Sequence, residues 1–277
     1  MQSKLISESE IQEMLQFTSV SHAAAWLKRT PEYAKAWADL DENSLHRGQI
    51  EKLLKASIFK DFSKIYHFAN PEQRKFLDLY SRRYEIRVLK EIMTNLFDHK
   101  STDAVDVSPY CDFFRRHSKL DLDRLTACTT MDEFINTLKG NEFYVPLSRI
   151  QNHDTALLFD YGMALDLYYF SMIWNVRKKL FSGKDLEQIT TAYGEKFDML
   201  NLQFISRSKR YFSMAPADIY ALLIPMNYKL KKEEITALVE ASTREEAQQI
   251  FRKTYYGKKY DHLSAHNLEE FYNYMLR

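Results

Sequence analysis

Two histidines one helical turn apart form the strongest candidate metal site in the sequence. His262 and His266 have the i, i+4 spacing that places two imidazoles on one face of a helix, and Glu269 and Glu270 follow them. Imidazole and carboxylate groups in that arrangement could ligate zinc, iron or manganese in a metal-dependent helical enzyme. A pair of solvated or capping histidines explains the same spacing, and we favour that interpretation. We therefore expect no metal site.

Two acidic residues, Glu85 and Asp198, lie within otherwise apolar predicted helices. A catalytic role would require the two carboxyl groups to converge and a pKa to be raised. We favour the simpler interpretation, in which each acid pairs with a basic residue near it in the chain. These basic residues are Arg82, Arg83, Arg87 and Lys196.

The sequence lacks the known motifs for phosphate binding, nucleophilic catalysis and zinc hydrolysis. It contains no G-x-x-x-x-G-K-[ST] or G-x-G-x-x-G loop, no nucleophile elbow, no H-E-x-x-H and no C-x-x-C. Cys111 and Cys128 match neither a metal spacing nor a secreted disulfide framework, so we expect free thiols in a reducing compartment. We predict no catalytic residue, no cofactor and a protein that is not an enzyme.

Basic residues cluster at three places, Arg82-Arg83, Arg115-Arg116 and Arg207 to Arg210. The net charge of +1 gives no global attraction to nucleic acid or to an anionic membrane, so we expect solvated faces and no nucleic-acid binding. The 18 tyrosines and 18 phenylalanines suit contacts with other proteins. The candidate partner-interface residues are Arg82, Arg83, Arg87, Arg207, Lys209 and Arg210.

Composition indicates that helices must position these side chains. Only 6 glycines and 6 prolines occur in 277 residues, which leaves few tight turns, and no stretch alternates long enough to predict a sheet. One predicted helix carries a buried apolar stripe, formed by Leu89, Ile92, Met93 and Leu96. The polar start shows no signal peptide, and apolar stretches such as Ile219 to Pro225 are far shorter than the roughly 20 residues that span a bilayer. We expect a protein that meets a membrane only through partners.

A pattern with a period of about 113 positions recurs along the chain, and such a period indicates repeated structural modules. Segments 19–33, 130–144 and 243–256 share a capping hydroxyl, an amphipathic turn, a basic residue, a small polar residue and an aromatic. In the last two segments the hydroxyl, from Thr130 or Thr243, is followed three residues later by a glutamate, which predicts a capping box.

A second block of the sequence keeps the same period. Residues 80–92 map onto residues 193–205, and Asn70, which with Pro71 predicts a helix start, maps onto Gly183. The predicted modules are residues 1–117, 118–230 and 231–277, the third of them truncated. The predicted long helices are 44–69 and 71–98 in the first module and 153–181 and 184–212 in the second.

Several motifs resemble those of one known family. They are a D-x-x-N-L helix at Phe197 to Leu202, its basic continuation at Arg207 and Lys209, a turn at 219–230 and a closing element at 241–256. Residues 4–33 and 83–90 resemble the family's opening and its first E-x-x-x-L-K helix. The family is that of the C subunit, called d in eukaryotes, of the V-type and A-type rotary ATPases. The resemblance covers most of the chain and is loosest between residues 100 and 160.

This resemblance implies similar helical modules around a pseudo-threefold axis, which form a funnel-like socket. It also implies a non-catalytic subunit that links the central-stalk subunits to the membrane proteolipid ring during ion transport. The expected location is cytoplasmic and peripheral on the membrane, through the ATPase complex, without a cofactor.

Two positions depart from the family pattern. Val88 stands where the family usually has asparagine, and the chain stops at Arg277, where the third module should continue into its own long helices. The shortened third module leaves an alternative open, in which the chain is a free-standing helical scaffold that binds other protein partners.

Overall fold

The computed structural model of the chain describes residues 6–37, 41, 45–98, 107, 110–151 and 156–261. Within these ranges the regular secondary structure consists of helices alone, so the predicted all-α class is confirmed. The candidate metal residues His262, His266, Glu269 and Glu270 lie outside the described residues.

The helices follow the chain from α1 to α15. They are α1 (Glu8–Met14), α2 (Val20–Arg29), α3 (Pro31–Trp37), α4 (Arg47–Phe68), α5 (Pro71–Phe97), α6 (Cys111–His117), α7 (Leu122–Thr126), α8 (Met131–Thr137), α9 (Tyr144–Gln151), α10 (Leu158–Leu180), α11 (Gly183–Tyr211), α12 (Pro216–Leu222), α13 (Lys232–Glu240), α14 (Arg244–Lys253) and α15 (Tyr255–Asp261). The four long helices begin and end within five residues of their predicted bounds.

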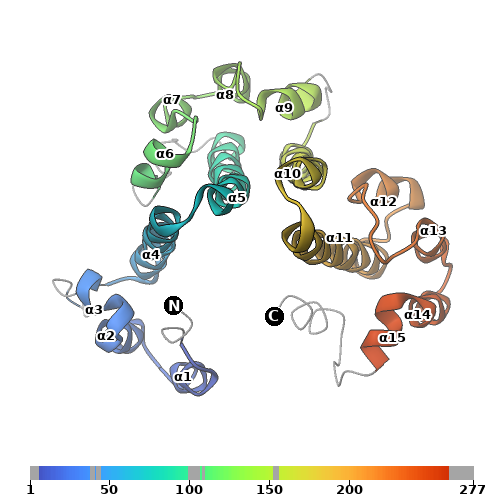
Figure 1. Ribbon diagram of the computed structural model, residues 1–277, viewed down its shortest axis with the longest axis horizontal. Helices are drawn as coiled ribbons and strands as arrows, with labels where there is room; N and C mark the ends of the chain where they lie inside the picture. The colour runs from blue at the N-terminus through green and yellow to red at the C-terminus, as the bar shows by residue number, and fades with distance from the viewer. Residues whose placement is uncertain are drawn as a thin grey trace.

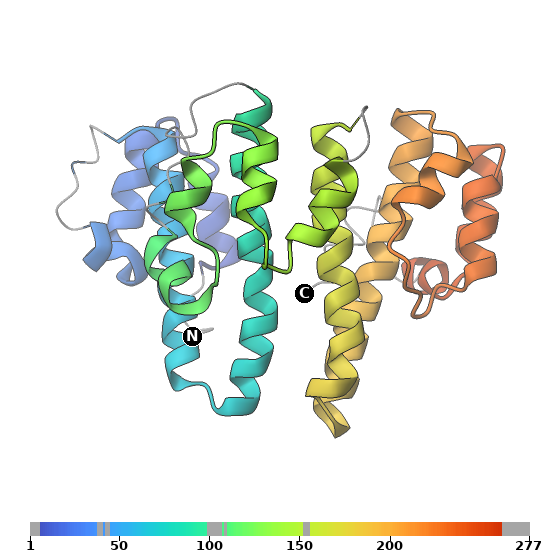
Figure 2. The same cartoon turned by 90° about the horizontal axis from the view of Figure 1, so that it is seen from above.

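The helices are arranged as an open ring that follows chain order, with α1 and α15 on the two sides of the opening (Figure 1). Helices α4 and α5 form one long antiparallel hairpin, and α10 and α11 form a second. Both hairpins extend beyond the layer of short helices toward the same side of the molecule (Figure 2). The tips of the two hairpins therefore lie at one end of the structure.

The turn into α5 shows why a hairpin forms at this point of the sequence. Asn70 is the N-cap residue, its side chain accepts a hydrogen bond from the Gln73 N–H at 2.9 Å, and Pro71 is the first helical residue. The Gln73 side chain in turn accepts from the Asn70 N–H at 3.0 Å. These two bonds satisfy backbone donors that the first helical turn leaves without partners, so the predicted helix start is confirmed.

The largest hydrophobic core lies where the two hairpins meet, with α5 packed along α10. The predicted stripe on α5 is buried, because Leu89, Ile92 and Met93 are 0% exposed and Leu96 is 6% exposed. This core runs from α4 to α11, so packing is continuous across residue 117, the predicted end of the first module. Two smaller cores join α2 to α4 and α11 to α15.

The helices α8 and α14, which correspond in the predicted repeat, begin with the same N-cap arrangement. Thr130 and Thr243 each cap a helix by accepting from the N–H of a glutamate three residues on, at 3.2 and 3.1 Å. Neither glutamate completes the predicted capping box on that threonine. Each accepts instead from the N–H one residue earlier, of Thr129 or Ser242, at 2.9 and 2.7 Å. The two segments depart from the prediction in the same way, while the division into modules stays a prediction.

Candidate functional site

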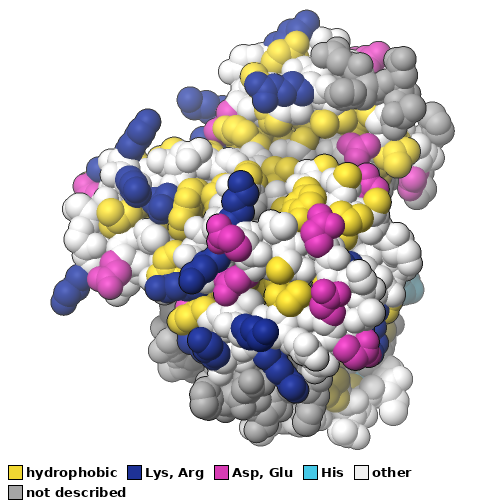
Figure 3. Space-filling view, turned by 90° about the vertical axis from the view of Figure 1, so that its right-hand side faces the viewer, with side chains coloured by type: hydrophobic (Ala, Val, Ile, Leu, Met, Phe, Trp, Pro, Cys, Tyr) yellow, Lys and Arg dark blue, Asp and Glu magenta, His cyan; other side chains and the backbone are white. Residues whose placement is uncertain are grey.

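The six basic residues predicted to face a partner differ in exposure. Arg82, Arg83 and Lys209 are partly buried and bind other parts of this chain. The remaining three residues, Arg87, Arg207 and Arg210, are exposed. The face that includes α12 to α15 mixes basic, acidic and hydrophobic side chains, without one sign of charge prevailing (Figure 3).

Arg82 lies at the centre of a partly buried ion network. Its Nη1 donates to both carboxylate oxygens of Glu85 at 2.9 Å, and its Nε lies 2.9 Å from a carboxylate oxygen of Glu142. Tyr168 donates to the other oxygen of Glu142 at 2.8 Å. We call these four residues the Arg82 network. The predicted pairing of Glu85 with a nearby arginine is confirmed.

The charge of the Glu85 carboxylate is stabilised by this network and not by water, because the side chain is only 1% exposed. Burial raises the pKa of Glu85, while the charge of Arg82 and hydrogen bonds from Ser118 and Arg82 oppose that shift. The side chain of Arg82 is 23% exposed, so the pair is poorly screened by solvent. The network therefore holds α5 against α10 and the segment before α9.

Asp198 is fully buried, and its predicted pairing with a basic residue is wrong. Its two oxygens accept from the backbone N–H groups of Tyr228, Lys229 and Leu230 at 3.1, 2.6 and 2.9 Å. The Tyr256 hydroxyl donates a fourth hydrogen bond, at 2.9 Å. Burial raises the pKa of the Asp198 carboxyl, and these four donors oppose the shift because they favour the ionised form.

Asn201 extends the same contact one turn further along α11. Its side-chain amide donates to the carbonyl of Ile224 at 3.0 Å and accepts from the N–H of Ile224 at 2.9 Å. We call Asp198, Asn201, Tyr256 and the bound backbone at 224 and 228–230 the Asp198 network. Val88, which corresponds to Asn201 in the repeat, is an apolar core residue with 0% exposure. This valine has no side-chain polar group that could make such a backbone contact.

Gly194 allows the segment bound by Asp198 to approach α11 closely. A Cβ at this position would overlap the ring of Tyr228, and the hydroxyls of Tyr228 and Thr191 lie 3.1 Å apart. Near the carboxyl end of α11, the ammonium group of Lys209 donates to the carbonyls of Val239 and Ala241, each at 2.5 Å. Lys209 therefore caps the carboxyl end of α13. A cation is favourable there because the last carbonyls of a helix carry partial negative charge.

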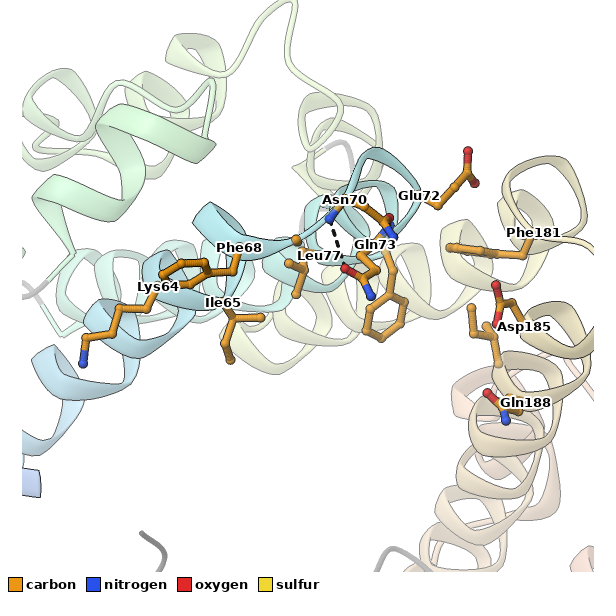
Figure 4. A pocket seen from close by; sticks show the side chains of 13 residues that line it. Lys64, Ile65, Phe68, Asn70, Glu72, Gln73, Leu77, Phe181, Asp185 and Gln188 are labelled. Carbon is orange, nitrogen blue, oxygen red and sulfur yellow. Dashed lines mark hydrogen bonds between the residues drawn. The ribbon is translucent and has the colours of Figure 1, made fainter. Parts of the chain in front are cut away.

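A groove between the hairpin tips carries exposed apolar side chains. It lies between the α4–α5 turn and the α10–α11 turn and has a volume of about 730 Å³ (Figure 4). Its apolar lining comes from both hairpins, through Ile65, Phe68, Phe76, Leu77, Phe181 and Ile189. We call this cavity the hairpin-tip groove.

Phe68 is the most exposed apolar side chain of the hairpin-tip groove, at 84% exposure, and Ile65 is 42% exposed. The ring centroids of Phe76 and Phe181 lie 6.4 Å apart, edge to face, and this contact joins the two hairpins. Burying a phenylalanine contributes about 2 kcal/mol, so covering Phe68 would add stability. No sequence motif marks this site, because the residues of the two tips lie far apart in the chain.

The described residues contain neither a cluster of metal ligands nor a helix that could span a membrane. No group of three or more His, Cys, Asp and Glu side chains among them could hold a metal ion. Across the described ranges, no helix has the length and apolar character that crossing a membrane requires. Glu85 and Asp198 have separate partners, so they do not form a catalytic carboxylate pair.

Comparison with known proteins identifies relatives of this chain. A sequence model of the ATP synthase (C/AC39) subunit family matches residues 1–277. The C subunit of the A-type ATP synthase of Methanothermobacter thermautotrophicus is 21% identical over 243 residues, which are 86% of this chain and 59% of that protein. The chain thus spans about 59% of the length of the curated relative that it matches.

Proposed function

The chain belongs to the ATP synthase (C/AC39) subunit family, and on that premise we propose that it couples the central stalk of a V/A-type rotary ATPase to the membrane proteolipid ring. In this role it performs no chemistry of its own. It lies on the cytoplasmic side and reaches the membrane through its partners.

The hairpin-tip groove is the observation that carries this proposal. Two helical hairpins project to one side of an open ring, and the groove between their tips exposes an apolar surface made of Ile65 and Phe68. Exposed apolar patches on soluble proteins mark contacts with other proteins. The position of the groove at the tips of two long hairpins suits a subunit that must bear load between two partners.

The two buried acids also support a structural role. Glu85 and Asp198 are each engaged by donors from this chain, so neither carboxylate is available to a substrate. The Arg82 network joins α5 to α10 and the segment before α9, and the Asp198 network joins α11 to the segment 224–230 and to α15. A subunit that transmits torque needs such fixed joints.

We expect the chain to co-purify with the central-stalk subunits and the proteolipid ring from detergent-solubilised membranes, as identified by mass spectrometry. Phe68→Asp places a charge in the hairpin-tip groove and is expected to lower recovery of at least one of these partners about tenfold or more, because the loss of one buried phenylalanine exceeds about 1.4 kcal/mol.

Ile58→Asp is the matched control for this experiment. Ile58 is also an exposed apolar residue of α4, at 47% exposure, but it does not line the groove. We expect recovery with Ile58→Asp to equal that of the unchanged protein. A clean preparation that contains neither the stalk nor the ring would refute the proposed function. Equal recovery with Phe68→Asp would show that the groove is not the contact surface.

A further inference from the structure

A second cavity, of about 510 Å³, lies beside α5, α7 and the segment that follows α8. Charged side chains dominate its wall. Four of them are cationic, Arg82, Lys119, Arg124 and Lys139, and two are acidic, Asp121 and Glu142. We call it the basic cavity. Its excess of two positive charges contrasts with the whole chain, whose net charge is only +1.

The two acids of the basic cavity are already engaged by other groups. Asp121 caps α7, where its carboxylate accepts from the Arg124 N–H at 3.2 Å. Glu142 belongs to the Arg82 network, in which Arg82 and Tyr168 occupy its two oxygens. Both carboxylates keep their negative charge, so four cations against two acids leave the wall of the cavity with an excess of two positive charges.

Three cations of the basic cavity, Lys119, Arg124 and Lys139, are exposed. Their side chains form no hydrogen bond or ion pair with any residue in the described part of the chain. Like charges held around one concave surface raise the local positive potential, since field lines concentrate in a cavity with low-dielectric walls. An anion in the cavity would relieve this repulsion.

The backbone positions of these cations are fixed by the core. Each cation lies next to a buried leucine of the cavity wall, namely Leu120 at 8%, Leu125 at 1% and Leu138 at 2% exposure. The loop that closes the cavity turns at Gly140, whose φ of +86° is a left-handed conformation that favours glycine. The three cations thus come from three separate elements but surround one cavity.

The charge of the basic cavity is specific to this part of the chain. At the corresponding positions of the next repeat, Arg82 is replaced by Glu195 and Arg124 by Ala237, whereas Lys119 and Lys139 keep cationic counterparts in Lys232 and Arg252. Asp121 corresponds to Glu234, so the second copy has two cations and two acids at these positions. Glu195 forms an ion pair of its own with Lys259 at 3.4 Å. The second copy of this region therefore lacks the excess of cations.

We propose that the basic cavity binds a phosphate-bearing anion, such as a diphosphate or triphosphate group. Arg124 and the two lysines supply N–H donors from three segments of the cavity wall, which suits an anion with several oxygens such as a phosphate group. The polar wall and the volume of about 510 Å³ suit a small, highly charged ligand. Free diphosphates and phospholipid head groups share this chemistry.

Calorimetric titration of the full chain with pyrophosphate, at physiological ionic strength, tests the proposal. We expect saturable binding that weakens about tenfold or more in the double variant Arg124→Gln and Lys139→Gln, because each removes a charge-assisted hydrogen bond. The matched control is Lys178→Gln with Lys179→Gln, which removes two exposed lysines of α10 outside the cavity. We expect the control to bind within about twofold of the unchanged protein.

Vesicles distinguish the two sources of the phosphate group. Phosphatidylcholine vesicles with and without phosphatidic acid are sedimented with the unchanged protein, the double variant or the matched control. Each sedimentation is carried out in the presence and in the absence of pyrophosphate. Retention by phosphatidic acid that pyrophosphate displaces assigns the cavity to a lipid head group, whereas pyrophosphate binding without retention assigns it to a free anion. The absence of both kinds of binding, or equal binding by the double variant, overturns the proposal.

Discussion

Replacing Asp198 with alanine is expected to lower the free energy of unfolding by about 4 kcal/mol, as measured by chemical denaturation followed by circular dichroism. The carboxylate is buried and accepts four hydrogen bonds, from three backbone N–H groups and Tyr256. Alanine leaves all four donors without a partner inside the protein, where water cannot replace the carboxylate. The magnitude is a large share of the stability of a domain.

Two further variants distinguish this mechanism from a general effect of changing α11. Glu187→Ala removes an exposed acid of the same helix and is expected to change stability by less than about 0.5 kcal/mol. Tyr256→Phe removes one of the four donors and is expected to cost about 1 kcal/mol. If Asp198→Ala were no more destabilising than Glu187→Ala, the Asp198 network would not contribute to stability.

Replacing Arg82 with methionine is expected to lower the free energy of unfolding by about 3 kcal/mol at neutral pH. Glu85 then remains buried without the cation that pairs with it. Methionine keeps most of the apolar stem, so the change in packing is small. The measurement is again chemical denaturation, repeated across pH. Arg87→Met, on the exposed side of α5, is the matched control, with an expected effect below about 0.5 kcal/mol.

The decrease in the free energy of unfolding caused by Arg82→Met is expected to become smaller as the pH falls. Burial already raises the pKa of Glu85, and removal of Arg82 takes away the charge that opposes this shift. A carboxyl whose pKa is higher in the folded than in the unfolded state stabilises the fold below the unfolded pKa, and this contribution is lost as the pH rises through the folded pKa. The variant should therefore differ least from the unchanged protein in acid. A deficit that is constant with pH would show that Glu85 does not carry the effect.

Features that depend on local spacing could be predicted from the sequence. The pair Asn70 and Pro71 predicted the start of α5, and the i, i+3, i+4, i+7 spacing of Leu89 to Leu96 predicted its buried face. Glu85 and Arg82, which are three residues apart on one helix, could likewise be expected to pair. Cys111 and Cys128 form no disulfide, as their number and spacing indicated. The helix start, the buried face and the ion pair each involve groups that lie within one or two helical turns.

Features that depend on tertiary contacts could not be predicted. Asp198 was expected to bind a nearby side chain, but its partners are backbone N–H groups on the segment 228–230 and the hydroxyl of Tyr256. Backbone donors are the same at every residue, so no side-chain pattern marks them. The bonds of Lys209 could not be predicted for a similar reason, since the carbonyls that it binds, of Val239 and Ala241, lie at the end of a different helix.

The Asp198 network also sets an order of events during synthesis of the chain. The ribosome releases α11 before the segment 228–230 and well before Tyr256, the most distant donor to Asp198. Until those residues emerge, only water can donate hydrogen bonds to the carboxylate, so this face of α11 stays exposed to solvent. The second hairpin is therefore expected to complete its packing late, after α15 has been made, while the first hairpin obtains the cation for its buried acid from its own helix.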